Sequence, residues 1–204
     1  MTRVVGVLLA GGRARRMGGG DKCLRTLAGE TLLARAIDRA RPQVDALVLS
    51  ANGDAARFAE YRLPVVADAV IDFAGPLAGV LAGMDWAAAN TEARDIATMA
   101  TDAPFFPSDF VSRLCAAREA VGAVLAVAAS AGRAHPVFGL WPVALRDDLR
   151  KALVDEGVRK IDAWTTRYEL ATVAFEGAGV DPFFNANTPG DLEAAAALAG
   201  RMTA

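Results

Sequence analysis

The sequence predicts an α/β protein built around a mostly parallel central sheet. Short runs of β-branched and other apolar residues alternate along the chain with longer segments whose apolar residues recur at helical spacing. This alternation is typical of layered α/β domains, in which right-handed crossovers join parallel strands. No internal repeat, low-complexity tract or linker interrupts it, so we expect a single domain over residues 1–204. Ligands of such sheets bind beyond the carboxyl ends of the strands.

The first half of the chain contains three expected strands and two expected helices. Val4–Leu9 is an apolar run that stops near a glycine pair, as a buried strand entering a loop does. Thr31–Arg41 places its apolar residues on one helix face. Ala46–Ser50 (ALVLS) and Pro64–Ala67 (PVVA) are short strand-like runs, and Leu77–Ala89 is a helical pattern that follows a Gly-Pro pair.

The second half continues the same alternation. Asp95–Ala100 (DIATMA) is expected to be a strand, and Ser108–Arg118 a helix with Ser108 as its N-cap. Thr188 and Pro189 suit the N-cap and first position of the last helix. The remaining expected elements are the strands Ala123–Ala128, Val137–Trp141 and Tyr168–Phe175 and the helices Arg146–Val154 and Asp191–Leu198.

Composition argues against several classes of protein. A formal net charge of −2 gives no bulk attraction to nucleic acid. No apolar stretch approaches the roughly 20 residues that cross a bilayer, and the apolar run at the N-terminus suits a strand better than a secretory signal. Two cysteines, Cys23 and Cys115, and a single histidine rule out a multi-histidine metal site and argue against a disulfide framework. We therefore expect a soluble, cytoplasmic monomer with no nucleic-acid or membrane partner.

The loop after the first strand is both glycine-rich and basic. It reads AGGRARRMGGGDK, with Arg16 and Lys22 among its cations. Glycines let backbone N–H groups approach phosphate oxygens, and the cations neutralise them, so the loop suits a polyphosphate. A P-loop is excluded because Lys22 is followed by cysteine. The dinucleotide fingerprint is excluded because Gly11 and Gly12 are adjacent rather than spaced.

Asp102 is a candidate metal ligand. It follows the apolar run Ile96–Ala100, so its carboxylate should project from a strand end into the ligand crevice. Magnesium needs few protein carboxylates, since phosphate oxygens and water complete its octahedron. The alternative role is that of a helix N-cap, but Pro104 and Pro107 delay any helix and Ser108 is better placed for it.

The opening string resembles that of the molybdenum cofactor guanylyltransferases (the MobA family). These belong to a larger group of nucleotidyltransferases with a three-layer, Rossmann-like fold. Segments that match in order extend the resemblance over almost the whole chain: Asn52, Asp68, GPLAG at residues 75–79, TDAP at 101–104, His135-Pro136 and NANTP at 185–189.

The resemblance implies roles for individual residues. Those implied for the nucleotide are Leu9, Ala10, Gly11, Gly12, Lys22, Ser50, Asn52, Asp68 and Asp102. Lys22, Arg16 and Asp102 would carry catalysis, with Asp102 holding Mg²⁺ or, in its place, Mn²⁺. Either Ser50 or Asn52 would recognise the nucleotide. On sequence alone Asp68 and Asn52 are equally explained as turn residues.

The second substrate is expected at the remaining polar positions. His135, Asn185 and Asn187 are the candidates, and for His135 a structural hydrogen bond or a substrate contact is favoured over the alternative role of general base. Trp86, Trp141 and Trp164 are expected to be core or interface aromatics. No Ser/His/Asp or Cys/His set can be assembled, which argues against a covalent intermediate.

The implied reaction is attack by the terminal phosphate of molybdopterin on the α-phosphorus of GTP, releasing pyrophosphate. Such a nucleophile is already ionised, so positioning and charge neutralisation suffice. Two alternatives remain. One is a cytidylyltransferase acting on the same pterin, which the glycine at position 11 disfavours; the other is a non-catalytic nucleotide-binding assembly protein. Molybdenum-insertion proteins and molybdoenzyme chaperones are the expected protein partners.

Overall fold

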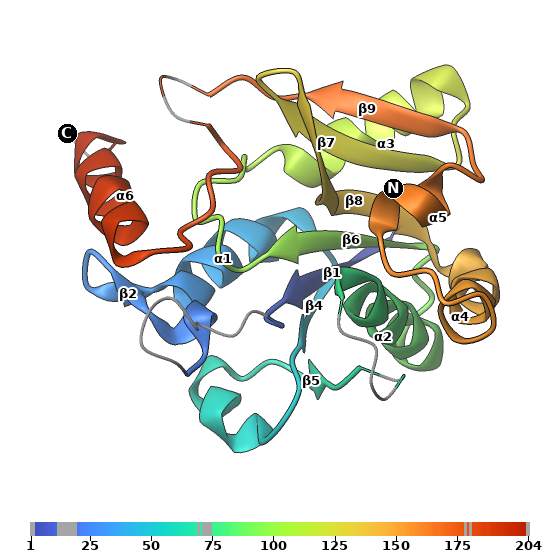
Figure 1. Ribbon diagram of the computed structural model, residues 1–204, viewed down its shortest axis with the longest axis horizontal. Coiled ribbons are helices and arrows are strands. Elements are labelled where there is room, and N and C mark those ends of the chain that lie inside the picture. Colours follow the sequence, from blue (N-terminus) through green and yellow to red (C-terminus); the bar gives the residue numbers. More distant parts are fainter. Residues whose placement is uncertain are drawn as a thin grey trace.

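A computed structural model describes residues 3–11, 20–68, 70, 75–177, 179 and 181–202 (Figure 1). Its centre is a seven-stranded sheet in the order β5-β4-β1-β6-β8-β7-β9. The strands are β1 (Val4–Leu9), β4 (Ala46–Ser50), β5 (Val65–Val66), β6 (Asp95–Ala100), β7 (Leu125–Ser130), β8 (Arg133–Pro142) and β9 (Leu170–Ala174). Gly12 and Arg16, with the rest of the opening loop over 12–19, lie outside the described residues.

The sheet is mostly parallel, as the sequence predicts. β1 pairs in parallel with both β4 and β6, β4 with β5, and β7 with β9. Only β8 runs against its neighbours, β6 and β7. The register between β7 and β8 shifts from the pair Val127–Gly139 to the pair Ala128–His135, so Pro136 sits in a bulge. Proline is tolerated there because it has no N–H to donate to the ladder, and the bulge re-aims the side chains that precede it.

Helices cover both faces of the sheet and make three layers (Figure 1). On one face, α1 (Leu32–Ala40) and α3 (Phe110–Val121) pack on alternate strand residues such as Leu8. On the other face, α2 (Pro76–Asn90), α4 (Arg146–Val154) and α5 (Ile161–Thr165) pack on the intervening strand residues, such as Val7. This alternation follows from the two-residue period of a strand. The three-layer α/β fold predicted from the sequence is confirmed.

Glycines on α2 allow this helix to lie very close to the sheet. A Cβ at Gly83 would stand 2.5 Å from a methyl of Val7, and one at Gly79 would stand 2.8 Å from Ser50 Oγ. Real Cβ atoms do not approach this closely, so any larger residue would push the helix away. Because Gly79 also lines the ligand cavity, this close approach shapes its wall.

Several element boundaries differ from the prediction. Ser108 is not a cap: α3 begins at Phe110, Asp109 occupies the N-cap position without a side-chain bond, and Gln43 Oε1 accepts the N–H of Val111 at 3.0 Å instead. A side chain from a distant segment has replaced the local cap. By contrast, Thr188 caps α6 (Pro189–Met202) as expected, and Thr31, expected inside the first helix, is instead the N-cap of α1.

The remaining differences are in short or irregular segments. The strand expected over Ala123–Ala128 is shifted to Leu125–Ser130, and the strand expected from Val137 begins at Arg133. The hairpin of β2 (Thr26–Leu27) and β3 (Glu30–Thr31) and the single-turn helix α5 have no counterpart in the prediction. In the described residues, no helix is long and apolar enough to span a membrane.

Candidate active site

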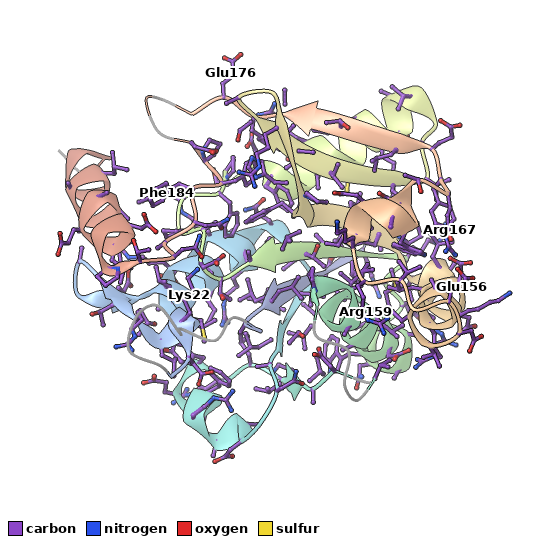
Figure 2. All side chains as sticks on the ribbon, in the orientation of Figure 1. Lys22, Glu156, Arg159, Arg167, Glu176 and Phe184 are labelled. Atoms are coloured by element: carbon purple, nitrogen blue, oxygen red, sulfur yellow. The ribbon has the colours of Figure 1, made fainter. Side chains whose placement is uncertain are left out.

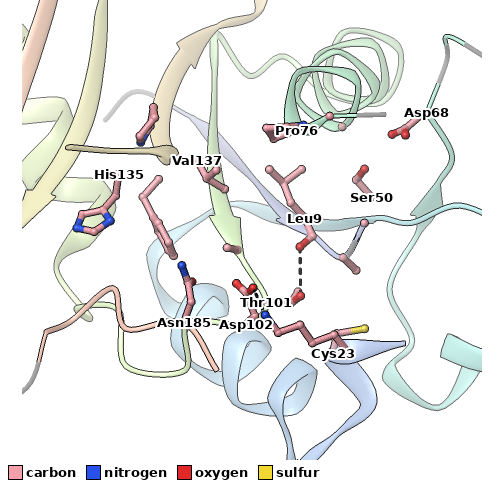
Figure 3. Close-up of a pocket in the computed structure, with 18 of the residues that line it drawn as sticks. Leu9, Cys23, Ser50, Asp68, Pro76, Thr101, Asp102, His135, Val137 and Asn185 are labelled. Atoms are coloured by element: carbon pink, nitrogen blue, oxygen red, sulfur yellow. Dashed lines mark hydrogen bonds and ion pairs between the residues drawn. The ribbon is translucent and has the colours of Figure 1, made fainter. Parts of the chain in front are cut away.

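A cavity of about 1120 Å³ opens at the carboxyl ends of β1, β4 and β6 (Figure 3). Its volume is above the roughly 300–1000 Å³ of a typical small-ligand pocket, so it has room for two substrates. The predicted site residues that line it are Leu9, Ala10, Gly11, Lys22, Ser50, Asn52, Asp68, Asp102, His135 and Asn185. Asn187 reaches the site through a contact with Lys22.

Lys22 and Asp102 form the charged centre of the cavity. Lys22 begins the short helix η2 (Lys22–Leu24) and is only 7% exposed, although it carries a full charge. Its Nζ donates to Asp102 Oδ2 at 2.6 Å and also to Asn187 Oδ1. The C-terminal segment is fixed to the same place, because Ala186 N donates to the carbonyl oxygen of Asp102 at 2.9 Å. Three segments far apart in sequence therefore meet at one ammonium group.

This position of Lys22 contrasts with that of other ion pairs. Arg167 pairs with Glu156 at the periphery of the molecule beside α4 and α5, whereas Lys22 lies inside, near the sheet (Figure 2). Peripheral ion pairs contribute little to stability because water screens them. A buried ammonium is costly unless it is paired, so the burial of Lys22 at the cavity wall, bound to a carboxylate, makes it a candidate functional group.

Asp102 does not serve as a helix cap. Its side chain accepts from Lys22, and α3 begins eight residues later, at Phe110. Thr101 Oγ1 donates to the carbonyl oxygen of Leu9 at 3.1 Å and ties the end of β6 to that of β1. Within the described part of the chain, Asp102 Oδ1 has no hydrogen-bond partner, so one carboxylate oxygen is available to a cation.

The donor set fits a hard divalent cation that takes most of its ligands from a substrate. No group of three or more His, Cys, Asp or Glu side chains that could hold a metal is found among the described residues. A single carboxylate oxygen together with phosphate oxygens and water is a normal environment for magnesium, which dehydrates reluctantly. A zinc or other closed protein-only site would need more side-chain ligands.

On the β4 side of the cavity, Asn52 and Asp68 bind each other. Asn52 Nδ2 donates to Asp68 Oδ2 at 2.7 Å, and Asn52 Oδ1 accepts the N–H of Asp68 at 2.9 Å. Gly53 has a φ of 86°, which confirms the Asn-Gly turn. Ser50 is buried at the end of β4 and also lines the cavity. Asn52 therefore both takes part in the turn and lines the cavity.

Two arginines of the site were not predicted from the sequence. Arg57, in the short helix η4 (Ala55–Tyr61), donates to Asp21 Oδ2 at 2.5 Å and to the carbonyl oxygen of Asn52 at 2.6 Å, which joins the opening loop to the β4 side. Arg133 lines the opposite side, at the start of β8. Neither belongs to a motif, and only the tertiary structure brings Arg133 to the cavity and Arg57 into contact with the cavity-lining Asn52.

His135 lies on the β8 side of the cavity, opposite Asp68 (Figure 3). Its Nε2 is 2.7 Å from Ser130 Oγ, and its ring packs on that of Phe183 with centroids 4.8 Å apart. Burial lowers the pKa of His135, so the imidazole is neutral near pH 7. The structure therefore gives His135 both a structural hydrogen bond and a place at the cavity wall.

The cysteine and tryptophan side chains are not candidates for chemistry. Burial, and then the charge of Asp21, raises the pKa of Cys23 to about 12, so this cavity-lining thiol stays protonated and is a poor nucleophile. Trp141 and Trp164, the latter on α5, are fully buried, with ring centroids 5.9 Å apart, as the sequence predicts for core aromatics.

Comparison with known proteins agrees with this geometry. The model of the MobA-like NTP transferase domain matches residues 6–171. The chain belongs to the MobA-like NTP transferase family. A protein of Bradyrhizobium sp. (strain ORS 278), named molybdenum cofactor guanylyltransferase, is 58% identical over 97% of this chain and 94% of its own length. The resemblance seen in the opening loop is thereby confirmed for the family.

Solved structures share the fold of this MobA-like chain. A molybdopterin-guanine dinucleotide biosynthesis protein A from Archaeoglobus fulgidus superposes with a TM-score of 0.78 at 22% identity, covering 97% of this chain and 100% of that one. A Mycobacterium tuberculosis protein solved in complex with manganese has a TM-score of 0.67 at 21% identity, covering 96% and 99%. At these identities the likeness concerns the fold.

Proposed function

We propose that this enzyme transfers GMP from GTP to the terminal phosphate of molybdopterin, forming the guanine dinucleotide cofactor and pyrophosphate. The observation that carries the proposal is the Lys22–Asp102 pair at the strand ends, inside a cavity large enough for a nucleotide and a second substrate. The names of relatives more than half identical over almost the full chain support the same activity.

In the proposed reaction, a phosphate oxygen of molybdopterin forms a bond to the α-phosphorus of GTP. The bond from that phosphorus to the bridging oxygen of the β-phosphate breaks, and pyrophosphate leaves with the electron pair. The nucleophile is ionised near neutral pH, so no general base is required. Catalysis then depends on positioning and on neutralising the charge that develops around the α-phosphorus.

Lys22 and the backbone after β1 supply most of this neutralisation from the described chain. The ammonium of Lys22 is held at the cavity wall by Asp102 and Asn187, and there it would exchange these partners for phosphate oxygens. The carbonyl oxygen of Leu9 is bound by Thr101, which fixes the strand end from which the glycine loop departs. We assign a further cationic contact to Arg16 on the basis of the resemblance alone.

Asp102 would hold Mg²⁺, or Mn²⁺ in its place, through its free carboxylate oxygen. When bound there with the nucleotide, the ion would neutralise charge on the phosphate oxygens. The chain's own contribution is to fix the carboxylate: Thr101 ties the strand end and Ala186 N binds the Asp102 carbonyl. Metal binding at Oδ2 would also require Lys22 to move from Asp102 onto a substrate phosphate.

Gly11 supports GTP over CTP. A Cβ built at Gly11 has no described atom within 4 Å, and the residue lines the cavity, so a side chain there would occupy space open to the ligand. A glycine leaves more of that space to the larger purine base. Ser50 and the Asn52–Asp68 pair lie on the same side of the cavity as candidates for contact with the nucleoside.

The test is pyrophosphate release with GTP, CTP or ATP in the presence of Mg²⁺ and molybdopterin. We expect release with GTP that depends on both the metal and the pterin. A preference for CTP would make the chain a cytidylyltransferase of the same pterin. Nucleotide binding without any pyrophosphate release would make it a non-catalytic assembly protein.

A further inference from the structure

Three polar side chains on the β8 side of the cavity form a hydrogen-bonded chain. Ser130, at the end of β7, is 4% exposed, and its Oγ is 2.7 Å from His135 Nε2 and 2.7 Å from Asp181 Oδ1. Asp181 follows β9 and also accepts the N–H of Phe183 at 2.9 Å. The bulge at Pro136 is the feature that brings His135 opposite the end of β7.

The protons available on the three side chains determine which group donates and which accepts in each of these hydrogen bonds. Partial burial raises the pKa of Asp181, but the hydrogen bonds from Ser130 and from Phe183 N–H more than offset that, and the net pKa lies below the ordinary value. Asp181 is therefore ionised near neutral pH and can only accept. The single hydroxyl proton of Ser130 is committed to Asp181. Ser130 Oγ can then only accept from His135, which must carry its proton on Nε2.

His135 therefore presents its other ring nitrogen as an acceptor. Burial lowers the pKa of the imidazole, the charge of Asp181 raises it and that of Arg133 lowers it, and the net direction is downward. In the neutral ring with a proton on Nε2, Nδ1 carries a lone pair. Within the described chain Nδ1 has no partner, and His135 lines the cavity.

The position of His135 in the sheet assigns it to the second substrate. The strand order places β4 and β5, with Ser50 and Asp68, on one side of β1 and β6, and β8 on the other side. Asp102 follows β6 and lies between the two groups (Figure 3), and Lys22 is bound to it, so the phosphates of both substrates would meet there. An acceptor on the β8 side suits a heterocycle that offers N–H donors, and a pterin ring offers a ring amide and an exocyclic amine. A phosphate, which only accepts near neutral pH, would be repelled by the lone pair.

We propose that Ser130 and Asp181 are positioning residues that hold His135 as the Nε2–H tautomer, so that Nδ1 accepts a hydrogen bond from an N–H group of the pterin ring. This inference rests on the proposed function for the identity of the second substrate. The tautomer itself does not depend on that function, because it follows from contacts within the protein. The two parts are therefore tested separately.

The tautomer is tested by nitrogen NMR of the uniformly labelled, full-length protein. The chain has one histidine, so the imidazole resonances need no assignment. Near neutral pH we expect one protonated, pyrrole-like nitrogen at Nε2 and one unprotonated, pyridine-like nitrogen at Nδ1. Molybdopterin should shift the Nδ1 resonance, and GTP alone should leave it in place. A proton on Nδ1, an imidazolium, or a shift with GTP but not with molybdopterin would overturn the proposal.

The positioning role is tested by the kinetics of Ser130→Ala. Loss of one neutral hydrogen bond that orients a ligand is expected to raise the KM for molybdopterin about tenfold, with the KM for GTP unchanged. Ser112→Ala is the matched control, because Ser112 Oγ only binds the carbonyl oxygen of Asp109 on the exposed face of α3. An equal rise in both KM values, or a rise for GTP alone, would refute the role.

Failure of the proposed function gives a different result. If the wild-type enzyme used another phosphate acceptor, molybdopterin would support no turnover, and recognition of a pterin by His135 would be refuted with it. The resonances of the wild-type protein would still decide whether Ser130 and Asp181 set the tautomer. If Ser130→Ala did not fold, that same spectrum would remain as the test.

Discussion

Replacement of Lys22 by methionine removes the ammonium and keeps most of the side-chain volume. Methionine fills the space of the aliphatic stem, so the change tests charge and hydrogen bonding more than packing. In the native structure Lys22 donates to Asp102 and to Asn187, and the lysine side chain is 9% exposed while that of Asp102 is 26% exposed. Both acceptors would lose their partner at a place that water reaches only in part.

The expected loss of stability is smaller than the expected loss of catalytic activity. Hydrogen bonds to charged groups contribute about 1.5–3 kcal/mol each, and removing the buried charge offsets part of this, so we expect about 2 kcal/mol of lost stability. For a chain of this length that is a fall in Tm of roughly 4–8 °C. Loss of a donor that stabilises transition-state charge costs about 2.7–4 kcal/mol, a fall in kcat of roughly 10²–10³-fold.

The assay for Lys22→Met measures kcat with GTP and molybdopterin and the thermal midpoint of the same preparation. A second readout is the affinity for Mn²⁺ without nucleotide, which should rise because Asp102 is no longer bound by an ammonium. Asn187→Ala is the control, because it removes one partner of Lys22 and leaves the charge in place. A variant that loses several degrees of Tm but keeps kcat within a few fold would show that Lys22 is structural.

Three other outcomes follow from the same geometry. Asp102→Asn keeps an acceptor for Lys22, so it should retain a native circular-dichroism spectrum while losing Mg²⁺-dependent transfer by more than about 10²-fold; an active variant would exclude the metal role. Gly11→Ala points into open space, so Tm should hold while kcat/KM for GTP falls about tenfold more than that for CTP; equal losses would contradict selection of the base at this position. Cys23, whose pKa is raised to about 12 by burial, should resist iodoacetamide at about pH 8 in the native protein and react after unfolding, which mass spectrometry can follow.

The apolar strands that carry the centre of the site were predictable from the sequence. β1, β4 and β6 are buried on both faces, so each reads as a continuous apolar run with clear ends, and the observed bounds agree with the predicted ones. Because ligands of such sheets bind where the strands end, the sequence pattern alone was enough to place Lys22 and Asp102 beside one ligand crevice.

The β8 side could be predicted only in part. The sequence predicted that this strand starts at Val137, after Pro136, because proline is rare inside a strand. In the structure a bulge accommodates Pro136, and the strand begins at Arg133. Ser130 and Asp181 belong to no motif and meet only through the tertiary fold. The two-residue strands β2 and β3 are likewise too short to leave a periodic pattern.

The central claim is that this cavity joins the α-phosphate of GTP to a phosphate of molybdopterin. The most direct measurement follows GTP labelled at its α-phosphate when enzyme, Mg²⁺ and molybdopterin are present. The account predicts label in a pterin dinucleotide and unlabelled pyrophosphate, with no transfer by Asp102→Asn. Label that stays in GTP, or appears as free GMP whether or not the pterin is added, would contradict it.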